Sequence, residues 1–186
     1  MFRPNDTAKH RLKAAALLLA VLAAGACLTW WIVSRADREM RAGLLQETQM
    51  AAQAVSVERL ESLSGTEADL TSPVYQRLKE QLVTARSTNP LCRFIYLLGR
   101  KPDGSLFFFV DSEPATSKDC SPPGQIYAEA VAGIHRAFTT PAGIVEGPYS
   151  DRWGKWVSAL VPIFEPNASP AQDKGCLLYT SPSPRD

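Results

Sequence analysis

Residues 92–111 read CRFIYLLGRKPDGSLFFFVD, and this stretch decides the fold. Two apolar runs rich in β-forming residues, 92–99 and 105–111, flank the tripeptide Pro102-Asp103-Gly104. Proline presets φ, aspartate bonds to the nearby backbone and glycine accepts positive φ, so the tripeptide is typical of a tight turn. The stretch therefore predicts a β-hairpin.

One helix is expected before the hairpin and another after it. Ser72-Pro73 fits an N-cap followed by proline at the first helical position, and this helix should end before Asn89-Pro90. A polar loop, 112–124, leads into the second helix. At helical spacing this second helix would bury one face, made of Tyr127, Ala130, Val131, Ile134 and Phe138.

Two further strands are expected at 143–148 and 155–164. The turn between them contains Asp151-Arg152-Trp153-Gly154. Because helices and hairpins alternate without parallel crossovers, the fold class is α+β, with an antiparallel sheet and flanking helices.

The apolar run 14–33 contains 20 residues without a charge, which is long enough to cross a bilayer as a helix. Trp30 and Trp31 lie at its end, where indole rings favour the membrane interface. Four Lys and Arg residues precede the run and three follow it closely, so the positive-inside rule favours a cytoplasmic N-terminus. We therefore expect an inner-membrane protein with its bulk outside the cytoplasm.

Two other interpretations of this run stay open. Ala24-Gly25-Ala26 fits the end of a cleaved signal peptide, and Cys27 fits the acylated residue of a lipoprotein. Either cleavage leaves the apolar LTWWIV segment on the mature protein.

After the span, residues 34–72 are expected to begin as a continuing helical stalk, with Met40, Leu44, Ala51 and Val55 at helical spacings. Residues 175–186, GCLLYTSPSPRD, resemble translated sequencing-adapter DNA, so we expect a non-native tail and a truncated parent. The expected divisions are a tail at 1–13, a span at 14–33, a stalk at 34–72, a domain at 73–174 and the non-native tail at 175–186.

Composition excludes several functions. The net charge of +1 and the lack of a basic block outside the N-terminal tail exclude a nucleic-acid partner. No phosphate-binding loop, metalloprotease, nucleophile-elbow, kinase or cyclase motif is present. His135 has no partner at metal-ligand spacing, so we expect no metal, no cofactor and no catalytic residue in this fragment.

Residues 89–163, with NPLCRFIYLLGRKPDGSLFFFVDSEP, SPPGQIY and EGPYSDRWGKWVSALVPI, resemble the extracytoplasmic PAS-like (Cache-type) input domains of bacterial membrane sensors. The resemblance implies small-ligand sensing for signal transduction and a homodimer formed through the stalk and missing cytoplasmic modules. It also implies a parent that is a sensor histidine kinase of a two-component system. A diguanylate cyclase parent and an anchored binding module without signalling stay open. Cys120 departs from the family pattern, in which an aromatic residue often follows the aspartate of this loop.

In PAS-like domains the ligand lies between the sheet and the helix and loop that cover it. Strand alternation from the hairpin turn places Phe107, Phe109 and Asp111 on one face, and Leu106, Phe108 and Val110 on the other. The expected ligand-binding residues are Tyr96, Asp111, Tyr127, Arg152 and Trp153. Asp111 and Arg152 would meet a zwitterionic ligand, and the aromatic side chains would form the walls of its site.

Cys92 and Cys120 lie at a strand start and in the long loop. An exported domain can keep a disulfide, but packed free thiols fit the sequence as well.

Overall fold

The computed structural model describes residues 4–140, 142–163 and 175–183. It forms two compact units, residues 1–40 and 41–186. The first unit is the N-terminal part of helix α1 (Pro4–Gln53), which is long and apolar enough to cross a membrane. Its apolar side chains are exposed, as expected of a segment that lipid surrounds.

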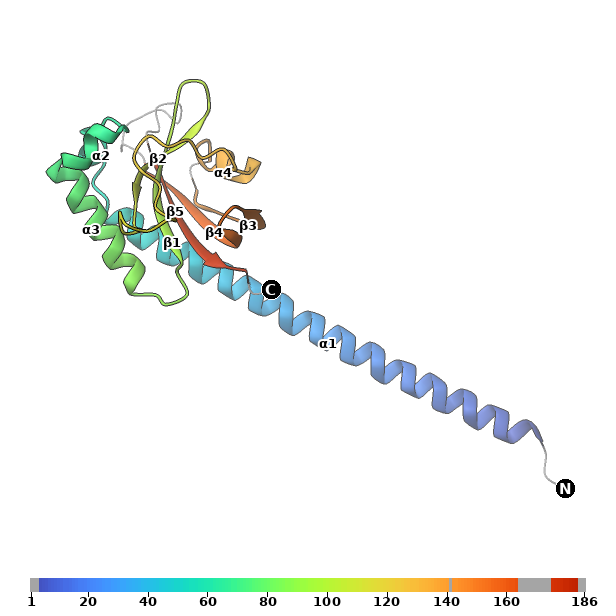
Figure 1. Ribbon diagram of the computed structural model, residues 1–186. Coiled ribbons are helices and arrows are strands. Elements are labelled where there is room, and N and C mark those ends of the chain that lie inside the picture. Colours follow the sequence, from blue (N-terminus) through green and yellow to red (C-terminus); the bar gives the residue numbers. More distant parts are fainter. Residues whose placement is uncertain (1–3, 141, 164–174, 184–186) are drawn as a thin grey trace. The chain divides into compact units, whose positions relative to one another are not determined.

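The second unit is an α+β domain built on one five-stranded antiparallel sheet (Figure 1). Its strands are β1 (Phe94–Arg100), β2 (Leu106–Asp111), β3 (Ile144–Asp151), β4 (Gly154–Ile163) and β5 (Gly175–Pro182). They lie in the order β2-β1-β5-β4-β3. The predicted fold class is therefore confirmed, as are both predicted hairpins, β1–β2 and β3–β4.

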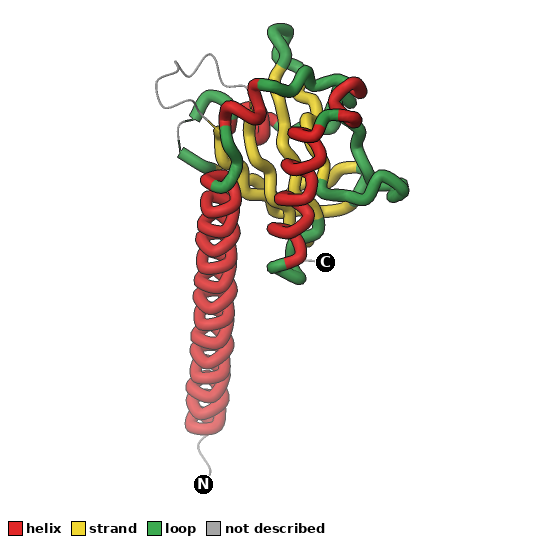
Figure 2. The backbone as a smooth tube through the Cα atoms, turned by 90° about the vertical axis from the view of Figure 1, so that its left-hand side faces the viewer, coloured by secondary structure: helices red, strands yellow, loops and turns green. Residues whose placement is uncertain are grey.

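The helices of this unit are α2 (Val57–Glu61), a 3-10 turn η1 (Glu67–Thr71), α3 (Pro73–Ser87) and α4 (Ala132–Ala137). Helix α3 begins as predicted, because the Ser72 hydroxyl accepts a hydrogen bond from the Val74 N–H and proline occupies the first turn. Figure 1 shows α3 and α4 on opposite sides of the sheet, and Figure 2 looks onto α3 with the strands behind it.

The end of α1 belongs to the second unit. Leu44, Thr48 and Ala52 are buried there, and Asn89, just after α3, donates a hydrogen bond to Glu47 on α1. The predicted helical continuation beyond the span is thus present to Gln53, and its last turns pack within the domain.

The predicted helix starting at Tyr127 is wrong in its length. Ile126 bridges Phe107 as a short extension of the sheet, and the Tyr127 N–H donates to the Leu106 carbonyl. Because these backbone groups are used by β2, the helix begins only at Ala132. Tyr127 is therefore positioned by its backbone hydrogen bond to the edge strand β2.

The predicted alternation of side chains between the two faces of β2 is also wrong beyond Phe108. Leu98 pairs with Phe108 and Leu97 with Val110, which leaves Phe109 as an extra bulge residue. Asp111 then pairs with Tyr96 and lies on the same face as Phe108. Phe107 and Phe109 occupy the opposite face, with ring centroids 4.6 Å apart.

β5 lies between β1 and β4, and its residues Gly175 to Thr180 are buried. This strand comes from the segment that the sequence predicts to be a non-native tail. That statement concerns the origin of the residues, and it stays a prediction. The end of the predicted domain, residues 164–174, and the last residues of the tail, 184–186, lie outside the described residues.

Candidate functional site

Aromatic side chains gather on the sheet face that α4 covers. The Tyr96 ring lies 5.5 Å from Phe94 and 5.0 Å from Phe108, measured between centroids. Phe108 lies 5.2 Å from Tyr127, and Trp153 packs within 6.4 Å of Phe94, Phe108 and Tyr127. We call these five residues, Phe94, Tyr96, Phe108, Tyr127 and Trp153, the aromatic cluster. Three of the predicted site residues thus meet in one place.

Two buried hydroxyl groups lack partners: one belongs to Tyr96 in this cluster, and the other to Ser121, whose backbone N–H bonds to Asp111. Tyr96 is 3% exposed and Ser121 is 1% exposed, and within the described part of the chain neither hydroxyl oxygen has a hydrogen-bond partner. An unsatisfied buried hydroxyl costs about 1–3 kcal/mol, so such groups in native proteins are usually matched by water or a ligand. The sequence pattern singles out Tyr96 but gives no signal for the Ser121 hydroxyl as a binding group.

Asp111 is fully buried beside them. Its two carboxylate oxygens accept the backbone N–H groups of Glu113 and Ser121, each at 2.7 Å. Burial raises the pKa of this carboxyl to about 6, although both hydrogen bonds and the charge of Lys79 lower it. Asp111 therefore holds both ends of the loop from 112 to 121 while keeping an incompletely compensated charge.

Asp151 is a second carboxylate at the same face, and it is not among the site residues predicted from the sequence. It accepts hydrogen bonds from the Trp153 N–H at 2.9 Å, the Trp156 indole N–H at 2.8 Å and the Tyr127 hydroxyl at 3.1 Å. An aspartate before a tight turn commonly bonds to the backbone two residues on. This pattern is the sequence signal that could have identified Asp151. Asp151 fixes the turn that carries Trp153.

Burial, followed by the charges of Asp111 and Asp151, raises the pKa of the Tyr96 hydroxyl. Burial also raises the pKa of the Tyr127 hydroxyl. Both phenols are therefore neutral throughout the physiological range, and each can donate a hydrogen bond.

Arg152 lies at the opening of the site. Its guanidinium carbon stands 4.0 Å from the centroid of the Trp153 ring, and its Nε is 3.6 Å from a Glu129 carboxylate oxygen. A cavity of about 240 Å³ opens beside it, lined by Lys118, Asp119, Cys120, Gln125, Arg152 and Trp153. The carboxylate partner that the described structure gives Arg152 is Glu129, and the joint contact of Arg152 and Asp111 with one ligand stays a prediction.

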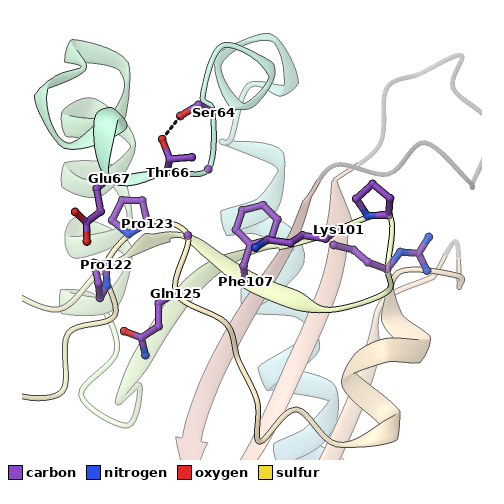
Figure 3. Close-up of a pocket in the computed structure, with 12 residues that line it drawn as sticks. Ser64, Thr66, Glu67, Lys101, Phe107, Pro122, Pro123 and Gln125 are labelled. Carbon is purple, nitrogen blue, oxygen red and sulfur yellow. Dashed lines mark hydrogen bonds between the residues drawn. The ribbon is translucent and has the colours of Figure 1, made fainter.

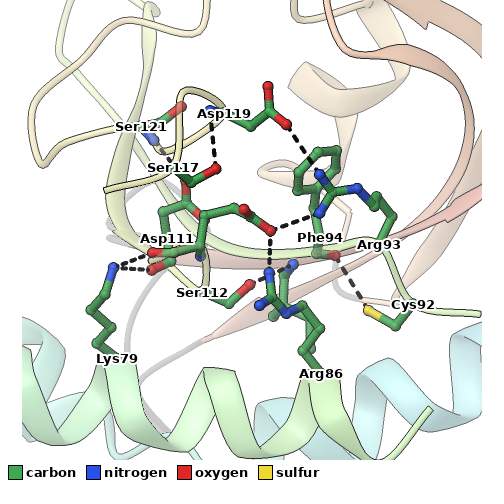
Figure 4. A network of polar contacts seen from close by, with 12 residues as sticks. Lys79, Arg86, Cys92, Arg93, Phe94, Asp111, Ser112, Ser117, Asp119 and Ser121 are labelled. Carbon is green, nitrogen blue, oxygen red and sulfur yellow. Dashed lines mark hydrogen bonds and ion pairs between the residues drawn. The ribbon is translucent and has the colours of Figure 1, made fainter. Parts of the chain in front are cut away.

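A polar network ties the loop at this site to α3 and β1 (Figure 4). The Glu113 carboxylate accepts hydrogen bonds from Arg86 on α3 and from Arg93, the latter at 2.7 Å. Arg93 also bonds to Asp119 at 3.1 Å, and Lys79 donates to the carbonyls of Asp111 and Glu113. Burial raises the pKa of Glu113, but a Ser117 hydrogen bond and the two arginines lower it below its ordinary value.

A second cleft, of about 590 Å³, lies over the opposite face of β2 (Figure 3). Phe107 lines it together with Lys101, whose ammonium is 5.8 Å from the ring centroid, and with Pro122 and Pro123. Ser64 and Thr66 at its edge are hydrogen-bonded to each other. The cleft is open, and neither it nor the 240 Å³ cavity is lined by Tyr96 or Ser121.

Cys92 and Cys120 are free thiols, so the disulfide between them that the sequence leaves open is not formed. Burial raises the pKa of Cys92 to about 12, which makes it a poor nucleophile. Within the described ranges, no group of three His, Cys, Asp or Glu side chains has the arrangement of a metal site.

No family model matches the chain, and no curated protein matches it. The solved structures similar to it include the ligand-binding domain of the Campylobacter jejuni chemoreceptor Tlp3 in complex with L-valine. It is 14% identical, with a TM-score of 0.38, and the match covers 80% of this chain and 62% of that one. The sensory domain of Tlp3 (CcmL) is likewise 14% identical, with a TM-score of 0.37 and coverage of 80% and 63%. The chain thus spans less than two thirds of either domain.

Proposed function

We propose that this chain is the membrane-anchored, extracytoplasmic input region of a signal-transduction protein, and that its aromatic cluster senses a small ligand. The observation that carries the proposal is the pair of buried, unpartnered hydroxyls of Tyr96, in the aromatic cluster, and Ser121, which bonds to the cross-strand partner of Tyr96, Asp111. A site with mostly apolar walls and a few inward polar groups is the usual chemistry of small-ligand recognition.

The proposed binding residues are Tyr96, Tyr127 and Trp153 as walls, with Asp111 beneath them and Arg152 at the opening. Trp153 closes the cluster on the side of the 240 Å³ cavity, so ligand entry requires movement of this ring or its turn.

The proposed parent protein is a sensor histidine kinase, located in the inner membrane with the domain in the periplasm and acting as a homodimer. A diguanylate cyclase parent and an anchored module without signalling are the alternatives. The intact gene beyond codon 174 distinguishes them, because a kinase or cyclase needs a second span and a catalytic module there.

A thermal-melting screen of the full chain in non-ionic detergent micelles tests the ligand site. A ligand that binds only the native state raises the melting temperature by mass action. We expect a stabilising small molecule whose effect falls in Tyr96→Phe and persists in Tyr179→Phe. Tyr179 is a matched control, since it is a buried tyrosine on β5 whose cross-strand partner is Ile95, on the other face of β1. Equal loss in both variants would contradict a site at the aromatic cluster.

A further inference from the structure

The aromatic cluster is bordered by two acidic side chains, and the described part of the chain shows no salt bridge to either, although the charge of Lys79 acts on Asp111. Asp111 ends β2 and Asp151 ends β3, and both act electrostatically on the Tyr96 hydroxyl. Their hydrogen bonds come from backbone N–H groups, a tyrosine and a tryptophan, all of which are neutral donors. Neutral donors stabilise a carboxylate without cancelling its charge.

Three cations near the site are engaged elsewhere, and a fourth, the exposed Lys118, lines the adjoining cavity. Lys79 bonds to two backbone carbonyls, at 2.9 and 2.6 Å, and Arg93 bonds to Glu113 and Asp119. Arg152 is paired with Glu129 at the opening. The net charge in the interior of the site is therefore negative, while the charges at its opening nearly cancel.

The negative charge of Asp111 and Asp151 favours a cationic ligand. The aromatic rings and the unpartnered hydroxyls favour the same kind of ligand. Aromatic faces attract cations, most strongly when the cation is desolvated, and Phe108, Tyr127 and Trp153 supply three of them. The Tyr96 and Ser121 oxygens each offer lone pairs that an N–H group can use. An ammonium has three such N–H donors and no acceptor.

We propose, building on the sensing function above, that the aromatic cluster binds a small primary ammonium compound, whose charged group lies beneath Trp153 against the Tyr96 and Ser121 hydroxyls. Asp111 and Asp151 supply the charge that holds it. The adjoining cavity of about 240 Å³ is below the usual range for drug-sized ligands, so the rest of the ligand is a short chain.

Three probes of matched size separate the charge types: propylammonium, propan-1-ol and acetate. Their dissociation constants are measured by titration calorimetry on the full chain in non-ionic micelles near pH 7. We expect propylammonium to bind at least about tenfold more tightly than propan-1-ol, the ratio that a desolvated cation–π contact supplies, and acetate not to bind. Equal binding of propylammonium and propan-1-ol, binding of acetate alone, or binding of none would overturn the inference.

A substitution that keeps the fold locates the charged group. Tyr96→Phe removes one oxygen from the site, and we expect it to weaken propylammonium binding about tenfold. Tyr179→Phe removes the same atom from the opposite face and should leave binding unchanged. Binding that survives Tyr96→Phe at full strength would overturn the assignment.

The pH dependence provides a second readout. The titratable groups that face Asp111 are Tyr75 and Lys79 on α3, Tyr96 on β1, and Glu113 and Cys120 in the loop. Burial raises the pKa of Asp111 itself to about 6, so a cation should bind more tightly as the pH rises through that value. Propylammonium affinity that falls over this interval would contradict the inference.

The two proposals fail in different ways. If the broad melting screen finds a neutral or anionic ligand that depends on Tyr96, the sensing proposal stands and the ammonium proposal is overturned. If the screen finds a ligand that binds equally well to Tyr96→Phe, the site itself is wrong.

Discussion

Tyr96 on β1 and Asp111 on β2 are direct cross-strand partners, and the bulge at Phe109 makes this pairing possible. The bulge turns Asp111 toward the aromatic cluster, where it joins Phe108. Because of this pairing, a carboxylate and a buried phenol share one site, and the charge of Asp111 contributes to the raised pKa of Tyr96 after burial.

Phe108 and Phe109 form a matched pair of neighbours on opposite faces. Both are buried, at 0% and 7% exposure, and truncation of either to alanine should lower the free energy of unfolding by about 3–5 kcal/mol. Only Phe108→Ala should also reduce ligand-induced stabilisation, since Phe109 packs against Phe107 on the other face. Urea unfolding with and without ligand measures both effects. A ligand effect confined to Phe109→Ala would reverse our assignment of the faces.

The pH dependence of stability should carry the signature of Asp111. Its folded pKa of about 6 is raised above the unfolded value, so its contribution to stability is present at low pH and lost as the pH rises from about 4 to 6. Glu113 and Asp69 have lowered pKa values, so their contributions are present above their unfolded pKa values and are lost as the pH falls through their folded ones. Without ligand, unfolding free energy should therefore be higher near pH 5 than near pH 7.

Asp111→Asn is the test variant for this effect, with unfolding followed by urea titration at both pH values. The amide cannot ionise, so the difference in unfolding free energy between pH 5 and pH 7 should shrink even if overall stability changes. An unchanged slope would show that another group dominates.

Glu113 should behave as the centre of the polar network in Figure 4. Glu113→Gln keeps the shape but removes the charge that Arg86 and Arg93 share. We expect a loss of about 2 kcal/mol in unfolding free energy, in the range for hydrogen bonds to charged groups. Glu80→Gln, on the exposed side of α3, is the control and should change stability by no more than about 0.5 kcal/mol. Equal effects of the two substitutions would exclude a special role for the network.

Membrane topology provides a prediction that is independent of the site. Four cationic residues before the span and three after it favour a cytoplasmic N-terminus. An alkaline phosphatase fused after Ser183 should therefore be active outside the inner membrane. Activity only from a cytoplasmic reporter at that position would reverse the orientation.

Much of the scaffold could be predicted because its signals are local. The Pro102-Asp103-Gly104 turn, the Ser72 cap and the turn at Asp151 each depend on residues close together in the sequence. The bulge at Phe109 could not be predicted, because register depends on the partner strand and one extra residue reverses the alternation.

The site was predicted less completely, because its residues are also positioned by contacts with partners distant in the sequence. Tyr127 was assigned to a helix on its apolar spacing, but its backbone bonds to Leu106 across the sheet edge. Ser121 carries no pattern of its own and is placed by Asp111, ten positions earlier in the chain. Arg152 and Asp111 are predicted to meet opposite charges of one ligand, and the sequence does not reveal the protein partners that each has in the structure.

Fluorine NMR on the full chain labelled with 5-fluorotryptophan tests the central claim most directly. The protein has four tryptophans, Trp30 and Trp31 in the membrane helix and Trp153 and Trp156 in the domain, so four resonances report on separate places. On saturation with the ligand from the melting screen, the Trp153 signal should shift while those of Trp30 and Trp31 stay fixed. A ligand that stabilises the protein without moving the Trp153 resonance would show that the aromatic cluster is not the sensing site.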